Sequence, residues 1–311
     1  MNAIYDVVII GGGPAGLAAG LYAARARLRT LLIDKGMIGG QIALTDRVEN
    51  YSGFPGGISG TDLSMAMHEQ ATKFGMETLY SAVEAIEVDG RYRVVKTTDE
   101  GEFRAKTVII TSGSEHKKLG VPGEKEFAAR GVSYCAVCDG AFFKDKVVAV
   151  VGGGDAAIDE GLFLTKFASK VIVIHRRDQL RAFKILQERA FANPKMEFIW
   201  DTVVESITGN GEVEALSLIN VKTEERSNLK VGGVFIYIGL QPNTDFTNGL
   251  LTLDSGRHIL VNDKMETGVP GILAAGDIRQ QSARQVVSAA GDGATAAITA
   301  EKYISENKWE E

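Results

Sequence analysis

The stretch Val7-Val8-Ile9-Ile10-Gly11-Gly12-Gly13-Pro14-Ala15-Gly16 decides the fold of this 311-residue chain. The apolar run at its start is typical of a strand that is buried on both faces. The glycines follow the spacing G-x-G-x-x-G, which is typical of the turn from such a strand into a helix that binds a dinucleotide. The stretch therefore predicts the strand, turn and helix of a β-α-β unit.

The same pattern returns 141 positions later without a gap. The two copies of the small-residue motif are Gly11, Gly13 and Gly16, and Gly152, Gly154 and Ala157. The first glycine permits the turn, the second lets a pyrophosphate approach the backbone, and the third small residue lets helix and strand pack closely. The phosphates would lie over the N-terminus of the helix, where free N–H groups favour negative charge. A single copy is as easily an ordinary glycine-rich turn, but two copies in the same strand–turn–helix–strand context argue against that interpretation.

The second strand of each copy ends differently, and this distinguishes the two predicted sites. The first copy ends at Asp34, where a carboxylate can accept hydrogen bonds from ribose hydroxyls. The second copy ends at His175, followed by Arg176, Arg177 and, one turn later, Arg181. Guanidinium groups suit phosphate oxygens, so the second site should prefer NADPH to NADH. We expect FAD in the first site and NADPH in the second; a solvated basic surface is the alternative interpretation of the arginines.

The second copy lies in the middle of the chain. Apolar strands are expected at 107–111, 234–238 and 271–275, and a helix of small residues from Ala283 to about Ile304, which has no sheet of its own. The economical interpretation is an α/β fold with two Rossmann-like FAD/NAD(P)-binding domains, the NADPH domain being inserted into the FAD domain. The expected domains are 1–115 with 246–311 for FAD, and 116–245 for NADPH.

The only two cysteines, Cys135 and Cys138, are separated by two residues and lie in the predicted NADPH domain. Cysteines at this spacing can close a redox-active disulfide, and the adjoining Asp139 could carry a proton as dithiol becomes disulfide. The alternatives to these catalytic roles are a purely structural disulfide and an Asp139 that only forms a turn. Zinc is disfavoured because it usually needs four ligands, and the four histidines have no ligand-like spacing; no metal is expected.

Seven motifs occur in an order and spacing that fit together: Gly11-Gly12-Gly13-Pro14-Ala15-Gly16, Gly39-Gly40-Gln41, Cys135-Ala136-Val137-Cys138-Asp139-Gly140, Gly152-Gly153-Gly154-Asp155, His175-Arg176-Arg177-Asp178, Gly276-Asp277 and Arg284-Gln285. With these residues the chain resembles the low-molecular-weight, bacterial-type thioredoxin reductases over essentially its whole length. Ala136-Val137 and Asp292 depart slightly from the usual pattern, and neither is a cofactor position.

The resemblance implies a homodimeric flavoenzyme that passes electrons from NADPH through FAD and the Cys135–Cys138 pair to oxidised thioredoxin. With the motif reasoning above, it gives these expected FAD residues: Gly11, Gly13, Pro14, Ala15, Gly16, Asp34, Lys35, Gly40, Gln41, Asn50, Asp277, Arg284 and Gln285. The expected NADPH residues are Gly152, Gly154, Asp155, Ala156, Ala157, His175, Arg176, Arg177 and Arg181. The catalytic residues are expected to be Cys135, Cys138 and Asp139. Rotation of the inserted domain about its two connecting segments would alternate the contacts of the disulfide.

Composition excludes several other classes of protein. A net charge of −6 gives no reason to expect nucleic acid as a partner. Residues 7–24 are uncharged, but their glycines and Pro14 favour a strand, turn and helix over a membrane span. No export signal is visible, so we expect a cytoplasmic protein.

The rival functions are reduction of a glutaredoxin-like protein or a peroxiredoxin, and nucleotide-dependent redox sensing without turnover.

Overall fold

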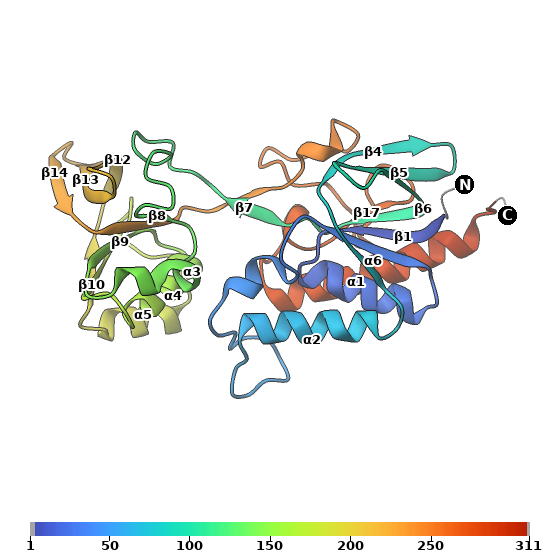
Figure 1. Cartoon of the computed structure of the whole chain (residues 1–311), viewed down its shortest axis with the longest axis horizontal. Helices are drawn as coiled ribbons and strands as arrows, with labels where there is room; N and C mark the ends of the chain where they lie inside the picture. Colours follow the sequence, from blue (N-terminus) through green and yellow to red (C-terminus); the bar gives the residue numbers. More distant parts are fainter. Residues whose placement is uncertain (1–3, 310–311) are drawn as a thin grey trace. The chain divides into compact units, whose positions relative to one another are not determined.

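The computed structural model describes residues 4–309, and the chain divides into two compact units. Unit 1 contains the residues up to Glu115 and from Gln241 onward, and unit 2 is His116–Leu240 (Figure 1). The second crossing therefore lies at 240/241, five residues before the expected 245/246. The two connecting segments pair with each other as short strands, β7 (Ser114–His116) and β16 (Leu240–Pro242).

Unit 1 is built on a seven-stranded sheet with the order β3-β2-β1-β6-β5-β4, in which β17 also pairs with β6. The strands are β1 (Tyr5–Ile10), β2 (Thr30–Asp34), β3 (Glu77–Tyr80), β4 (Val83–Asp89), β5 (Tyr92–Thr97), β6 (Glu102–Ile110) and β17 (Ile272–Ala274). Strands β1, β2, β3, β6 and β17 are parallel, whereas β4, β5 and β6 form an antiparallel meander.

Strand β1 is buried on both faces, as its apolar run predicts. Val7 and Ile9 belong to one core with residues of α1 and α6, and Val8 and Ile10 belong to the core on the other face of the sheet. The helices of unit 1 are α1 (Pro14–Arg25), α2 (Gly60–Thr72) and α6 (Val286–Glu306), with 3-10 turns at Gly40–Leu44, Asp245–Thr247 and Gly276–Ile278. Helices α1 and α6 lie side by side (Figure 1) because Gly293 allows close approach: a Cβ there would be 2.0 Å from the Ala15 carbonyl oxygen.

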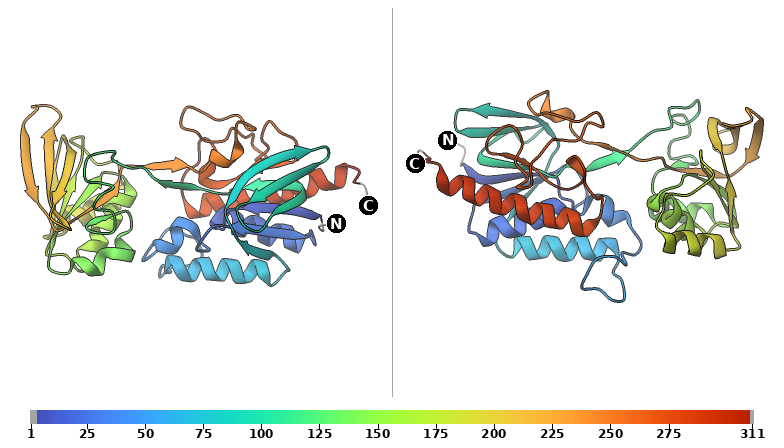
Figure 2. Two further views of the ribbon diagram at one scale, coloured as in Figure 1. Left: turned by 45° about the horizontal axis from the view of Figure 1, so that its top comes forward. Right: turned by 180° about the vertical axis from the view of Figure 1, so that it is seen from behind.

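Unit 2 contains a five-stranded parallel sheet with the order β11-β10-β9-β15-β8. Its strands are β8 (Val132–Ser133), β9 (Val147–Gly152), β10 (Lys170–Ile174), β11 (Met196–Ile199) and β15 (Gly233–Tyr237). A separate antiparallel meander comprises β12 (Thr202–Gly209), β13 (Val213–Asn220) and β14 (Arg226–Lys230) (Figure 2). The helices are α3 (Ala136–Asp139), α4 (Asp155–Leu164) and α5 (Lys184–Ala192), with a 3-10 turn at Gly140–Phe143.

The internal repeat of the sequence is a repeat of structure. The segment β1–α1–β2 of unit 1 corresponds to β9–α4–β10 of unit 2, and each lies in a sheet with equivalent order, β3-β2-β1-β6 and β11-β10-β9-β15. The predicted fold class, two Rossmann-like domains with one inserted into the other, is confirmed. Residues 7–24 form β1 and α1, and no helix within residues 4–309 has the length and hydropathy of a membrane span.

Candidate redox site and nucleotide sites

Cys135 and Cys138 form a disulfide across the short helix α3, with their Cα atoms 5.4 Å apart. Cys135 is half-buried at the start of the helix, and Cys138 is exposed. The Cys138 N–H donates to Cys135 Sγ over 3.1 Å. This contact ties the Cys135 sulfur to the backbone of α3, while Cys138 is the more exposed of the two.

Ser133 connects the disulfide to Asp139, and sequence reasoning missed it. The Ser133 hydroxyl donates to Asp139 Oδ2 over 2.6 Å and accepts from the Cys135 N–H over 3.1 Å. Ser133 is 4% exposed at the end of β8, so its hydroxyl is held in place by packing. The carboxylate of Asp139 is thus held beside the turn that carries both sulfurs.

A second group of polar side chains holds the backbone of α3 and was also missed. The Ala136 N–H donates to Tyr237 Oη over 2.9 Å and to Glu160 Oε2 over 3.2 Å. Burial, together with the charge of Glu160, raises the pKa of Tyr237, so its hydroxyl stays neutral. Tyr237 ends β15 and Glu160 lies in α4, which ties the disulfide turn to the second β-α-β unit.

Of the three motif glycines in the first turn, only Gly13 has room for a side chain. Gly11 has φ +109°, and a Cβ there would lie 2.5 Å from the Thr111 carbonyl oxygen. A Cβ at Gly16 would lie 1.9 Å from the Gly11 carbonyl oxygen. Gly13 differs, because a Cβ there would meet no atom of the protein within 4 Å. Packing explains the first and third glycines, while the space at the second fits a bound pyrophosphate.

The second turn repeats this arrangement. Gly152 has φ +150°, and a Cβ there would lie 2.4 Å from the Tyr237 carbonyl oxygen and 2.8 Å from Ala157 Cβ. A Cβ at Gly154 would meet nothing within 4 Å. Gly154 caps α4, and Asp155 and Ala156 begin the helix. The fit to a second dinucleotide is therefore the same as in unit 1.

Asp34 and the segment after it lie at the first turn. Asp34 accepts from the Gly12 N–H over 2.6 Å and from the Gly36 N–H over 2.7 Å. A Cβ on Gly40 would come within 3.4 Å of Gly13 Cα, so this second glycine segment lies against the first. Lys35 forms an ion pair with Glu115, an exposed partner that sequence reasoning did not anticipate.

The expected flavin residues from distant parts of unit 1 make three further contacts. Asn50 Nδ2 donates to Gln285 Oε1 over 2.8 Å, which joins residues 235 positions apart. Gln41 Nε2 donates to the Ser114 carbonyl oxygen over 3.4 Å. Arg284 is exposed with φ +54°, and one of its terminal nitrogens lies 3.4 Å from His258 Nε2.

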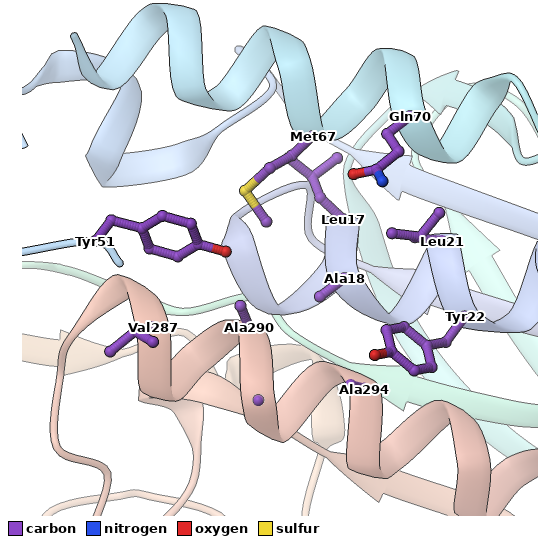
Figure 3. A pocket seen from close by; sticks show the side chains of 11 residues that line it. Leu17, Ala18, Leu21, Tyr22, Tyr51, Met67, Gln70, Val287, Ala290 and Ala294 are labelled. Carbon is purple, nitrogen blue, oxygen red and sulfur yellow. The ribbon is translucent and has the colours of Figure 1, made fainter. Parts of the chain in front are cut away.

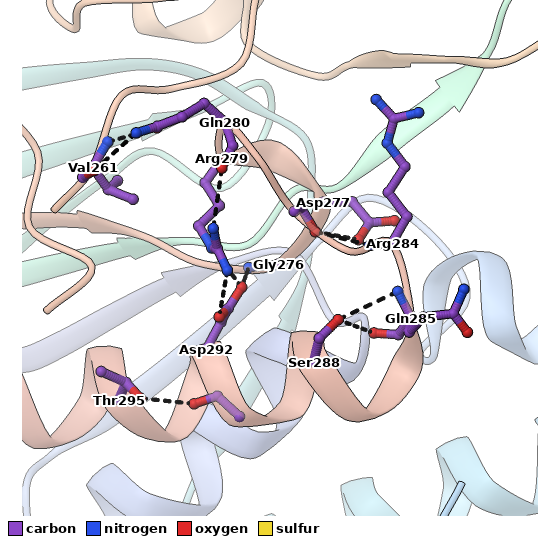
Figure 4. Close-up of polar contacts among 12 residues, drawn as sticks. Val261, Gly276, Asp277, Arg279, Gln280, Arg284, Gln285, Ser288, Asp292 and Thr295 are labelled. Carbon is purple, nitrogen blue, oxygen red and sulfur yellow. Dashed lines mark hydrogen bonds and ion pairs between the residues drawn. The ribbon is translucent and has the colours of Figure 1, made fainter. Parts of the chain in front are cut away.

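Asp277 lies in a loop that Arg279 and Asp292 hold (Figure 4). Arg279 donates to both carboxylate oxygens of Asp292, over 2.7 and 2.9 Å, and Asp292 also accepts from the Gly276 N–H over 3.1 Å. Asp277 itself accepts from the Ser282 hydroxyl over 3.1 Å. Asp292 is therefore the partner that attaches this loop to α6.

Replacing Asp277 by Asn should stabilise the flavin-free protein at alkaline pH. Burial raises the pKa of Asp277, and the negative charge of Asp292 adds to this effect; Ser282 and nearby arginines oppose it. A carboxyl whose pKa is raised by folding contributes stability below its unfolded pKa, and that contribution is lost as pH rises through the folded pKa. We expect Asp277→Asn to raise Tm by about 2 °C at pH 8 and to lose this advantage towards pH 4. A Tm difference that is independent of pH, measured by calorimetry, would contradict this assignment.

The basic cluster, defined as Arg176, Arg177 and Arg181, follows β10. All three side chains are exposed, and none forms an ion pair with a carboxylate in the described part of the chain. His175 is only 5% exposed and lies against Gly153, with its buried Nε2 lacking a hydrogen-bond partner. Burial, with help from the basic cluster, lowers the pKa of His175, so its imidazole is neutral at pH 7. Unpartnered guanidinium groups fit a phosphate-bearing ribose.

A groove of about 290 Å³ lies between α1, α2 and α6, with Met67 and Tyr51 among its lining side chains (Figure 3). None of the expected flavin or NADPH residues lines it. The chemistry of this chain is therefore to be sought at the two glycine turns and the disulfide.

The chain matches the model of one protein family, described as pyridine nucleotide-disulphide oxidoreductase, over residues 5–293. This chain belongs to the pyridine nucleotide-disulphide oxidoreductase family. Within the family it is similar to a thioredoxin reductase of Bacillus subtilis, with 53% identity over 97% of this chain and 96% of the relative. A thioredoxin reductase of Listeria monocytogenes is 50% identical over 98% of this chain and 95% of the relative.

Solved structures agree with the family assignment. The crystal structure of Lactococcus lactis thioredoxin reductase, in its FR conformation, superimposes with a TM-score of 0.95 at 47% identity, covering 97% of this chain and 100% of that one. A T. acidophilum thioredoxin reductase gives 0.92 at 33% identity, covering 97% and 98%. The resemblance inferred from the motifs is confirmed.

Proposed function

We propose that this chain is a thioredoxin reductase that moves an electron pair from NADPH, with the help of FAD, to the Cys135–Cys138 disulfide and on to oxidised thioredoxin. The observation that carries the proposal is the disulfide itself: it lies in the same unit as a dinucleotide turn and a basic cluster without carboxylate partners. The curated relatives at about half identity support the choice of thioredoxin as substrate.

Unit 1 is the proposed FAD-binding domain, and the space at Gly13 fits that group. The residues that would hold it are the expected set: Gly11, Gly13, Pro14, Ala15, Gly16, Asp34, Lys35, Gly40, Gln41, Asn50, Asp277, Arg284 and Gln285. When bound, FAD supplies the means of carrying an electron pair between a nicotinamide and a disulfide. Asp34 orients the glycine turn through the Gly12 N–H, and the Arg279–Asp292 pair holds the loop of Asp277.

Unit 2 is the proposed NADPH-binding domain. Gly152, Gly154, Asp155, Ala156 and Ala157 form the turn for the pyrophosphate, and Asp155 also accepts from the Phe183 N–H over 2.7 Å. His175, Arg176, Arg177 and Arg181 would surround the 2′-phosphate.

The cysteine pair is the group that reacts directly with the protein substrate. Overall, NADPH, one proton and the Cys135–Cys138 disulfide become NADP⁺ and a dithiol. A thiolate of that dithiol then attacks the thioredoxin disulfide to form a mixed disulfide, and the second cysteine resolves it, releasing reduced thioredoxin. Asp139, which Ser133 holds in the turn that carries both cysteines, would exchange a proton with the dithiol.

Replacing both Arg176 and Arg177 by Ala should raise the KM for NADPH at least about 100-fold, because charge-assisted contacts to a phosphate contribute roughly 1.5–3 kcal/mol each. The KM for NADH should change less than about threefold, since NADH has no 2′-phosphate. Steady-state kinetics with both coenzymes measure this. Equal losses for NADPH and NADH would show that the arginines do not read the 2′-phosphate.

The proposed function is tested by anaerobic rapid mixing of the purified flavoprotein with NADPH or NADH, followed by addition of candidate thioredoxins. We expect rapid bleaching of the flavin by NADPH and its recovery when an oxidised thioredoxin is added. Bleaching without recovery by any thioredoxin, but with recovery by a glutaredoxin-like protein or a peroxiredoxin, would reassign the substrate. No bleaching would contradict the proposal as a whole.

A homodimer and a cytoplasmic location accompany this proposal. Exposed apolar side chains on α1, α2 and α6, among them Tyr22, Met65 and Val287, offer surface that a second copy could cover. The mass of the purified protein by light scattering tests the dimer.

A further inference from the structure

Lys222 binds two carboxylates beside the basic cluster. Its Nζ lies 3.2 Å from Asp178 Oδ2 and 3.0 Å from Asp201 Oδ2. Asp178 directly follows Arg177 in the chain, and the Asp201 N–H donates to the Arg177 carbonyl oxygen over 3.3 Å. Both acids therefore belong to the two loops that carry the basic cluster and its surroundings, one after β10 and one after β11.

The turn between β13 and β14 fixes the backbone of Lys222. Asn220 Oδ1 accepts from the N–H groups of Lys222 and Thr223, over 2.9 and 3.0 Å. The Val221 N–H donates to the Asp201 carbonyl oxygen over 2.6 Å. The lysine is thus presented to the two acids by a turn that is itself bonded to one of them, although its side chain is exposed.

The charges around the cluster would be different without this lysine. Asp201 and Asp178 raise the pKa of Lys222, and Lys222 lowers the pKa of Asp178, so Lys222 and Asp178 carry opposite charges at neutral pH. Without Lys222, the carboxylates of Asp178, next to Arg177 in the chain, and Asp201, whose N–H donates to the Arg177 carbonyl oxygen, would be free to pair with guanidinium groups of the basic cluster. With Lys222 in place, no guanidinium of the basic cluster pairs with a carboxylate anywhere in residues 4–309.

We propose that Lys222 is a positioning residue for coenzyme selection: it holds Asp178 and Asp201 so that the basic cluster stays available to the 2′-phosphate of NADPH. This inference rests on the proposed function of unit 2 as the NADPH domain. Lys222 acts through the arginines and not through the nicotinamide, the flavin or the disulfide. Its removal should therefore affect ligands that carry a 2′-phosphate and leave ligands without one unchanged.

The test compares two probes that differ only in that phosphate, adenosine 2′,5′-bisphosphate and adenosine 5′-monophosphate. Their Kd values are measured by calorimetry on the flavin-loaded wild type and on Lys222→Met. For each protein, the readout is the ratio of the Kd for the monophosphate to the Kd for the bisphosphate. Carboxylates within about a Debye length of a phosphate repel it appreciably, and they also compete for the arginines. We expect the preference for the bisphosphate to fall about 3- to 10-fold in Lys222→Met.

Two further variants separate this role from a general effect on the fold. Lys222→Arg keeps the cation and should keep the ratio within about twofold of the wild type. The double variant Asp178→Asn with Lys222→Met removes one of the released carboxylates and should recover part of the preference. An unchanged ratio in Lys222→Met, loss of preference in Lys222→Arg, or no recovery in the double variant would each overturn the role of Lys222. A wild type that binds the two probes equally would instead contradict the NADPH assignment of unit 2.

Discussion

Replacing Cys135 or Cys138 by Ser should lower the rate of thioredoxin reduction at least about 1000-fold, whichever cysteine is changed. A single remaining sulfur can form a mixed disulfide with thioredoxin but has no neighbour to resolve it, so turnover stops. The rate is measured as NADPH-dependent appearance of thiols on thioredoxin.

The same variants should still oxidise NADPH with a small artificial acceptor such as ferricyanide, because this reaction does not need the sulfurs. The matched control is Val137→Thr, a change of similar size in the same turn that leaves both cysteines and should keep thioredoxin reduction within about threefold. Serine variants that retain thioredoxin reduction would exclude the disulfide from the reaction. Loss of ferricyanide reduction as well would point to damage elsewhere.

Replacing Gly13 by Val should give a protein that folds but is purified without flavin. Gly13 has φ −75° and ψ −178°, an extended conformation that a β-branched residue adopts without strain, and no protein atom lies within 4 Å of the added Cβ. The added side chain would instead occupy the space proposed for the pyrophosphate, so we expect FAD affinity to fall at least about 100-fold. The bound flavin is quantified by its absorbance, and folding by the thermal transition of the flavin-free proteins.

Gly154→Val is the matched control in the second copy. Gly154 is also extended, with φ −94° and ψ −177°, and also has no neighbour within 4 Å of a Cβ. This variant should retain FAD but bind NADPH at least about 100-fold more weakly. Loss of flavin from Gly154→Val, or retention by Gly13→Val, would contradict the assignment of the two turns.

The sequence predicted most of the framework because its signals are local. Apolar runs mark β1 and β9, and the glycine spacing marks the turns that follow, so both β-α-β units could be found from adjacent residues. The start of the last helix was expected at Ala283 but lies at Val286. Arg284 has φ +54° and Gln285 is extended, so a helix cannot include them.

The parts of the site that could not be predicted are contacts between distant elements. Ser133, the last residue of β8, donates to Asp139. Tyr237 contacts Ala136 from a strand that lies 101 positions later in the chain. The pair Arg279–Asp292 joins a loop to a helix. The sequence around these residues has no pattern that indicates their partners. The order of the strands and the packing within each unit bring the partners together.

The bond between Cys135 and Cys138 is the one that NADPH should reduce. The direct measurement mixes the flavin-loaded protein anaerobically with NADPH alone, quenches it with acid, alkylates free thiols and determines the mass of the peptide that contains both cysteines. We expect no alkylation before NADPH is added and alkylation of both cysteines afterwards. A disulfide that stays intact in excess NADPH would contradict it.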